Sequence, residues 1–158
     1  MIILGIDPGT TRIGFGVIQM TATGFSCLDY GVISNKGSER PGYFRATSQE
    51  LSRLITSHRP NLAVVERLFF TKNQKTAMAV SEMRGVILLT LSDHDIPVQE
   101  PTPSEVKQAI SGYGRALKPQ MRQTARMILR LKDAIKSDDA ADALALAICG
   151  AISNPRGL

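Results

Sequence analysis

The chain is poor in cysteine and histidine and has no long apolar run. The two cysteines, Cys27 and Cys149, are too few for a disulfide framework and lack metal-ligand spacing, so we expect buried, reduced thiols. The two histidines, His58 and His94, have no partner at ligand spacing, which argues against a zinc site. No apolar stretch reaches the roughly 18 to 20 residues of a membrane span, and no secretory signal opens the chain. These absences predict a cytoplasmic protein without a membrane segment.

The length fits one folding unit, and the charge fits a polyanionic partner. At 158 residues the chain has the size of a typical single domain, so we expect one domain over residues 1–158. Its 19 Lys and Arg against 14 Asp and Glu give a net charge of +5. This mild excess favours nucleic acid as a partner, although ordinary enzymes also show it.

Apolar periodicity divides the chain into strands and helices. The expected strands are Ile2 to Ile6, Ile13 to Met20, Phe25 to Ser34, Leu62 to Glu66 and Ile96 to Val98. The expected helices are Tyr43 to Ser57, Asn73 to Leu91, Pro103 to Ile110, Met121 to Leu131 and Ser137 to Ile148. The first three strands suggest an antiparallel meander, and a helical crossover lays the fourth parallel to the first. The order predicts an α/β fold, a five-stranded mixed sheet with helices on both faces.

Acidic side chains stand where metal ligands gather in such folds. Asp7 and Glu66 close two strands expected to run parallel, and ligands collect beyond the carboxyl ends of parallel strands. Asp142 lies in an apolar terminal helix that we expect to be buried, where a carboxylate is costly unless it is paired or binds a metal. Asp138 and Asp139, one turn earlier, both reach the same face. Because like charges repel, the pattern predicts divalent cations and metal-dependent phosphodiester chemistry.

Each of these residues also has a purely structural explanation. Asp7 could open the turn that follows it, and Glu66 could pair with Arg67. Asp138 and Asp139 could simply favour a helix N-terminus. Only the combination of positions favours a metal site over these separate explanations.

Taken together, the motifs resemble those of the RuvC-type Holliday junction resolvases of bacteria. The matching segments are Gly5-Ile-Asp7-Pro-Gly9, Val65-Glu66 with Phe69 and Lys72-Asn73, Arg84-Gly85-Val86 and Asp139-Ala-Ala-Asp142-Ala-Leu. The resemblance implies a ribonuclease H-like fold and cleavage of four-way DNA junctions by symmetric paired nicks. It also implies a homodimer and cooperation with a branch-migration motor. Gly85 would permit close approach of another helix, either at a dimer seam or in the core.

The resemblance also assigns the catalytic site. It places metal-binding carboxylates at Asp7, Glu66, Asp139 and Asp142, and thereby selects Asp139 over Asp138. Two Mg²⁺ ions about 3.5 to 4 Å apart, replaceable by Mn²⁺, would activate a water and stabilise the leaving oxygen during in-line attack.

Aromatic and basic residues near the acidic positions form the expected DNA-binding surface. Two phenylalanines follow Glu66, and aromatic faces stack on unpaired bases. The resemblance implies that Phe69 wedges into the junction centre, whereas Phe70 is left open as a packing residue. The basic positions implied in backbone contact are Lys72, Lys107, Arg115 and Lys118. Arg122, Arg126 and Arg130, four apart, either extend this surface or form the exposed side of an amphipathic helix.

Other classes of function compete with this interpretation. The segment from Gly5 to Thr11 resembles the phosphate loop of actin- and Hsp70-type ATPases, but those enzymes enclose the nucleotide between two lobes. A non-catalytic module that binds branched DNA fits the charge but leaves Asp142 unexplained. A nuclease acting on RNA or RNA·DNA hybrids stays open within the same fold.

Overall fold

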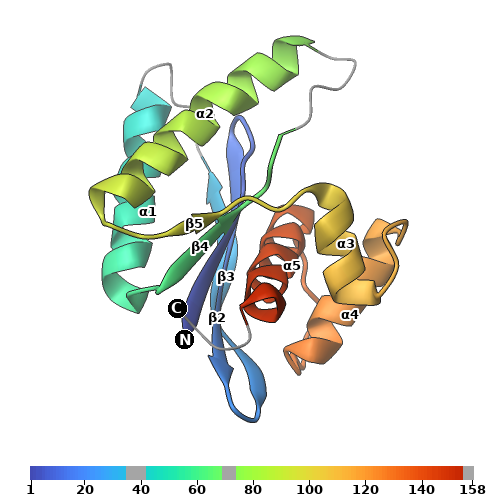
Figure 1. The fold of residues 1–158 in the computed structure, drawn as a ribbon. Helices are drawn as coiled ribbons and strands as arrows, with labels where there is room; N and C mark the ends of the chain where they lie inside the picture. Colours follow the sequence, from blue (N-terminus) through green and yellow to red (C-terminus); the bar gives the residue numbers. More distant parts are fainter. Residues whose placement is uncertain (35–41, 69–73, 155–158) are drawn as a thin grey trace.

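The computed structural model describes residues 1–34, 42–68 and 74–154 (Figure 1). The strands are β1 (Ile2–Asp7), β2 (Arg12–Thr21), β3 (Gly24–Ser34), β4 (Leu62–Val65) and β5 (Val98–Gln99). The helices are α1 (Gly42–His58), α2 (Gln74–Asp93), α3 (Pro103–Ser111), α4 (Lys118–Ile128) and α5 (Asp138–Ser153). The order of strands and helices is the one that the sequence predicts.

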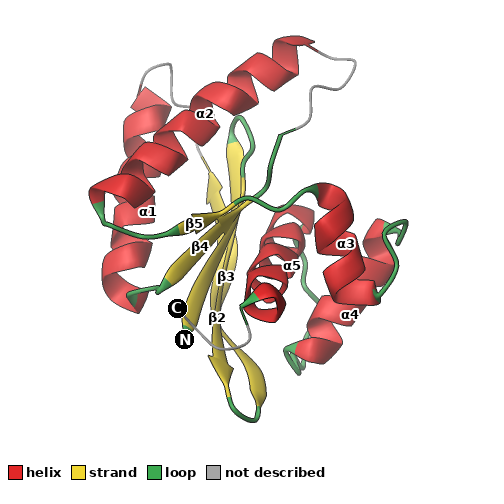
Figure 2. Cartoon of the chain, in the orientation of Figure 1, coloured by secondary structure: helices red, strands yellow, loops and turns green. Residues whose placement is uncertain are grey.

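The strands form one mixed sheet in the order β3-β2-β1-β4-β5. β1, β2 and β3 make the predicted antiparallel meander, and β4 runs parallel to β1 with Val65 beside Ile6. α1 and α2 cover one face of the sheet, and α3, α4 and α5 lie on the other (Figures 1 and 2). The predicted five-stranded mixed sheet with helices on both faces is therefore confirmed.

The central strands are buried on both faces, which explains their unbroken apolar sequence. Successive side chains of a strand point to opposite faces, so neighbours in β1 enter different cores. Ile3 packs in the core under α5, and Leu4 packs in the core under α1 and α2. Both side chains are at most 1% exposed.

Glycines in β1 and β2 let α5 lie unusually close to the sheet. A Cβ atom at Gly5 would stand 2.0 Å from the backbone oxygen of Ala143, and one at Gly14 would stand 2.0 Å from that of Asp139. Gly14 is also the register partner of Asp7, the last residue of β1. The close contact therefore brings the first two turns of α5 beside the end of β1.

The structure corrects the predicted bounds of the last strand. β5 begins at Val98 rather than Ile96. Pro97 lacks a backbone N–H and cannot donate to the ladder, and it instead accepts a bond from the N–H of Ala63 at 2.9 Å. The strand therefore starts two residues later than predicted.

The structure also corrects the predicted helix from Met121 to Leu131. α4 ends at Ile128, and Arg130 lies beyond it with a φ of 52°. The Arg126 guanidinium donates to the carbonyl oxygens of Leu131 and Lys132 at 3.2 and 2.6 Å, and so closes the helix end. Arg122 pairs with Asp138. The three arginines therefore do not form one stripe on a continuous helix.

Two smaller observations complete the fold. Of the helices that the structure describes, none combines the length and the apolar character needed to cross a bilayer. Cys149 is buried as expected, but Cys27 is only partly buried, which corrects the prediction for that residue.

Candidate active site

A cavity of about 290 Å³ lies beyond the carboxyl ends of β1 and β4. Asp7 ends β1, Glu66 follows β4 directly, and Asp142 enters from the second turn of α5. Lys107 of α3 and Lys118 of α4 line the same cavity. The structure thus brings together side chains that lie up to 135 residues apart in the sequence, from Asp7 to Asp142.

The carboxylates in this cavity oppose one another's ionisation. Burial, and after it the charges of Glu66, Asp142 and Asp139, together raise the pKa of Asp7 to about 7. Burial and the charge of Asp142 likewise raise the pKa of Glu66. The cavity therefore holds more negative charge than the surrounding protein stabilises.

Lys118 supplies part of the missing positive charge. Its ammonium group donates to Asp142 Oδ2 at 2.8 Å, and this bond raises the pKa of Lys118. The Asp142 side chain is 36% exposed, although α5 is buried around it as the sequence predicts. The expectation that Asp142 lies inside the core is wrong, because the cavity opens beside it.

The two aspartates at the start of α5 have different surroundings. Asp139 accepts a bond from Arg12 Nε at 2.8 Å, and the same guanidinium lies 3.3 Å from the hydroxyl of Ser137, the N-cap residue. Asp138 instead pairs with Arg122 of α4 and is 63% exposed. Of these two aspartates, only Asp139 is close enough for its charge to raise the pKa of Asp7. This geometry favours Asp139 over Asp138 as the member of the site.

A partly buried arginine fixes the position of Glu66. Arg84 of α2 donates through Nε to the carbonyl oxygen of Glu66 at 3.2 Å and also pairs with Glu100. Its side chain is only 17% exposed. Sequence reasoning did not assign a role to Arg84 or Arg12. Their partners lie 18 and 127 residues away, so no local pattern could have identified these contacts.

The predicted DNA-binding residues fall in different places. Lys107 and Lys118 line the acidic cavity, whereas Arg115 is exposed in the loop between α3 and α4. Phe69 and Lys72 lie outside the described residues, as does Phe70. The structure therefore places two of the five predicted contact residues beside the carboxylates.

The donor set fits a hard divalent cation. Carboxylate oxygens are the ligands that Mg²⁺ and Mn²⁺ prefer, and a divalent charge would relieve the repulsion that raises the pKa of Asp7. Among the described residues, no three Asp, Glu, His or Cys side chains stand close enough to enclose a metal ion. Lys118 and Arg12 each hold one carboxylate instead. A metal ion would therefore compete with Lys118 for Asp142 and with Arg12 for Asp139.

Comparison with known proteins identifies the family. The model of the family described as "Crossover junction endodeoxyribonuclease RuvC" matches residues 3–150. A protein of that description from Petrotoga mobilis is 47% identical over 150 residues, which cover 94% of this chain and 92% of the relative.

Solved structures agree with this match. The Thermus thermophilus RuvC structure has a TM-score of 0.91 and 29% identity, covering 98% of this chain and 96% of that one. A T. thermophilus RuvC in complex with a Holliday junction substrate has a TM-score of 0.89 and 28% identity. That match covers 99% of this chain and 97% of the T. thermophilus chain. The likeness confirms the ribonuclease H-like fold. The chain therefore belongs to the RuvC family of crossover junction endodeoxyribonucleases.

Proposed function

We propose that this chain resolves four-way DNA junctions by symmetric paired nicks, with Asp7, Glu66, Asp139 and Asp142 as its metal-binding catalytic residues. The observation that carries the proposal is the convergence of Asp7, Glu66 and Asp142 on one cavity, in a chain of this family. The substrate is suggested by the T. thermophilus relative, whose structure was solved with a Holliday junction.

Each part of the cavity has a role in the proposed reaction. Two Mg²⁺ ions, or Mn²⁺ in their place, would supply a metal-activated water and stabilise charge on the leaving oxygen. Asp7 and Glu66 present oxygen donors from two neighbouring strand ends, and Arg12 holds the Asp139 carboxylate at the start of α5. Lys107 and Lys118 bring positive charge to a polyanionic strand entering the cavity. Phe69, Lys72 and Arg115 would contact the junction outside it.

The proposal includes a homodimer that places one site on each of two strands. Met78, Glu82, Gly85 and Leu89 follow one another at spacings of four and three residues, which places them on one face of α2. The Met78 and Leu89 side chains are 66% and 62% exposed. A Cβ atom at Gly85 would meet nothing within 4 Å, so the core of this chain does not require the glycine. A second copy packed on this face would explain both features.

We further propose that the chain acts as a single cytoplasmic nuclease domain and works with a branch-migration motor. These parts of the proposal rest on membership of the family. The actin- and Hsp70-type alternative is not favoured, because the family match spans residues 3–150.

Incubation with three substrates tests the proposed activity. A synthetic immobile four-way junction, a linear duplex and an RNA·DNA hybrid are each incubated with and without Mg²⁺. We expect paired nicks in the junction alone, and only with metal. Equal cutting of all three would contradict junction selectivity, and metal-dependent binding without any cutting would favour the non-catalytic binding module.

Replacement of Asp7 tests the assignment of the site. We expect Asp7→Asn to bind the junction as tightly as the wild type while its nicking rate falls by at least about a thousandfold, since one metal ligand is lost. Gel-shift titration and single-turnover cleavage measure the two quantities. Normal nicking by Asp7→Asn would refute the assignment.

A further inference from the structure

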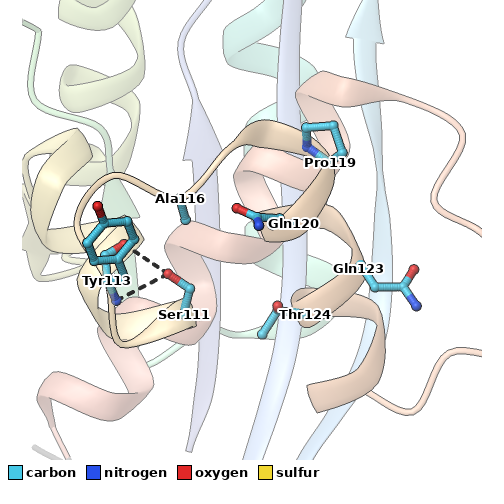
Figure 3. Close-up of a pocket in the computed structure, with 7 residues that line it drawn as sticks. All are labelled: Ser111, Tyr113, Ala116, Pro119, Gln120, Gln123 and Thr124. Atoms are coloured by element: carbon cyan, nitrogen blue, oxygen red, sulfur yellow. Dashed lines mark hydrogen bonds between the residues drawn. The ribbon is translucent and has the colours of Figure 1, made fainter.

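A second cavity, of about 530 Å³, lies beside the loop between α3 and α4 (Figure 3). Ser111 at the end of α3 lines it, the loop contributes Tyr113 and Ala116, and α4 contributes Gln120, Gln123 and Thr124. Neighbouring residues of α4 line the two cavities, because Lys118 faces the acidic one and Pro119 the second. A strand whose phosphate lies at Lys118 would therefore pass within reach of the second cavity.

The loop holds the exposed ring of Tyr113 on a fixed backbone. Gly112 ends α3 in the left-handed conformation with a φ of 69°, and Gln108 donates to its carbonyl oxygen at 2.9 Å. The hydroxyl of Ser111 accepts the backbone N–H of Tyr113 at 3.3 Å (Figure 3). Ala116, which donates to the Tyr113 carbonyl oxygen, is 4% exposed. The Tyr113 side chain nevertheless remains 60% exposed, so an aromatic face is presented to solvent at little entropic cost.

The α4 side of this cavity is polar and carries no negative charge. The side-chain oxygen of Gln120 accepts a hydrogen bond from the Leu117 N–H at 2.9 Å. Its amide NH₂ group can therefore donate to a ligand. Gln123 and Thr124 add an amide and a hydroxyl group. None of the described residues that line the cavity is acidic, and the exposed Arg115 follows Tyr113 by two residues. An aromatic ring with nearby amides suits a nucleobase, which stacks on the ring and hydrogen-bonds through its edge.

We propose that this cavity binds one unpaired nucleobase of the DNA strand that is being cut, with Tyr113 stacking on the base and Gln123 contacting its edge. The inference rests on the proposed function, because the acidic cavity must hold the scissile phosphate for the base to be a neighbour of the cut. It makes Tyr113 and Gln123 determinants of the sequence preferred around the nick.

Fluorescence of a base analogue tests the stacking. Single-stranded oligonucleotides that carry 2-aminopurine are titrated with wild type, Tyr113→Ala, Tyr113→Phe and Met127→Ala. Met127 is a matched control, since it is 60% exposed on α4 but does not line the cavity. We expect wild type, Tyr113→Phe and Met127→Ala to quench the analogue equally. Tyr113→Ala should lose the quenching and about 5-fold or more in affinity, the effect of removing one stacked base. Unchanged quenching and affinity in Tyr113→Ala would overturn the proposal.

Cleavage of a mixed substrate tests the contact to the base edge and separates the two proposals. Four-way junctions randomised around the nick are cut by wild type, Gln123→Ala and Met127→Ala, and the products are sequenced. We expect wild type and Met127→Ala to show the same base preferences around the nick, and Gln123→Ala to lose the preference at one of these positions. The same preferences in all three would overturn the role of Gln123. A wild type that quenches the analogue but cuts no junction would contradict the proposed function and leave the base site standing.

Discussion

Asp7 stands among other carboxylates in a position that opposes its charge. Its pKa of about 7 arises first from burial and then from Glu66, Asp142 and Asp139. Lys118 lowers the pKa of Asp7 but is held on Asp142, so it compensates only part of the repulsion. Such a site favours binding of a partner that brings concentrated positive charge, because the surrounding residues do not supply enough of it.

This imbalance predicts an effect of pH on stability. The folded carboxyl of Asp7 has a pKa of about 7 against 3.8 for the ordinary group, so the folded state retains the proton longer. Stability without metal is therefore lost as pH rises from about 4 through about 7. Asp7→Asn cannot ionise, and it should exceed the wild type in free energy of unfolding by on the order of 3 kcal/mol at pH 8. Urea unfolding in EDTA at pH 4 and at pH 8 measures the difference in free energy of unfolding between the two proteins.

Added metal supplies the control for this prediction. The two proteins should have nearly equal stability near pH 4, where the folded Asp7 carboxyl is protonated. At pH 8, Mg²⁺ should stabilise the wild type more than Asp7→Asn, because binding removes the repulsion. Equal stability of the two proteins at pH 8 in EDTA would show that burial and the neighbouring carboxylates do not raise the pKa of Asp7.

At the scale of elements, the site depends on how closely α5 approaches β1 and β2. Gly5 and Gly16 are register partners at the centre of this contact, and Cβ atoms there would meet α5 at 2.0 and 2.8 Å. On α5, the backbone of Ala143 faces Gly5, and Leu144 faces Gly16. A wider separation would carry Asp139 and Asp142 away from Asp7.

Gly5→Ala should therefore weaken both the fold and the site. The added methyl would displace α5, and we expect a loss of about 3 kcal/mol or more in the free energy of unfolding. Gly42→Ala is the matched control, since a Cβ there meets nothing within 4 Å and it begins α1 on the opposite face. Urea unfolding measures both variants. A Gly5→Ala protein as stable as Gly42→Ala would contradict the described approach of α5.

At the scale of the whole molecule, the two faces of the sheet serve different purposes. The face under α5 carries the acidic cavity and, beside α4, the proposed base site. The face under α1 and α2 holds a second core, and beyond it α2 presents Met78, Gly85 and Leu89 to solvent. Arg84 of α2 reaches back to the Glu66 carbonyl oxygen, so the proposed dimer face and the site share one helix.

Leu89→Glu should disrupt the proposed dimer without unfolding the chain. The Leu89 side chain is 62% exposed, so a charge there costs little in one copy but would be buried between two. Sedimentation equilibrium should show a dimer for wild type and a monomer for Leu89→Glu. Leu28→Glu, at a 43% exposed position of β3, should remain dimeric. A dimeric Leu89→Glu protein would place the seam elsewhere.

Much of the fold could be predicted because its signals are local. Continuous apolar runs identified β1 and β4, helical spacing identified α1 and α2, and turn residues separated β2 from β3. The end of α4 could not be predicted this way. It depends on where the Arg126 side chain reaches the carbonyl oxygens of Leu131 and Lys132, which is a contact and not a periodicity.

The sequence by itself determined which residues bear charge at strand ends and helix starts, and its motifs indicated the family. Only the tertiary structure decided how these charges are paired. In the structure Asp138 pairs with Arg122, Asp139 with Arg12 and Asp142 with Lys118. Asp142 lies at the edge of a cavity rather than in the core. The physical reason is that a pattern along the chain fixes the direction of a side chain within its element. The distance between charges on different elements depends on how closely those elements pack, here through the glycines under α5.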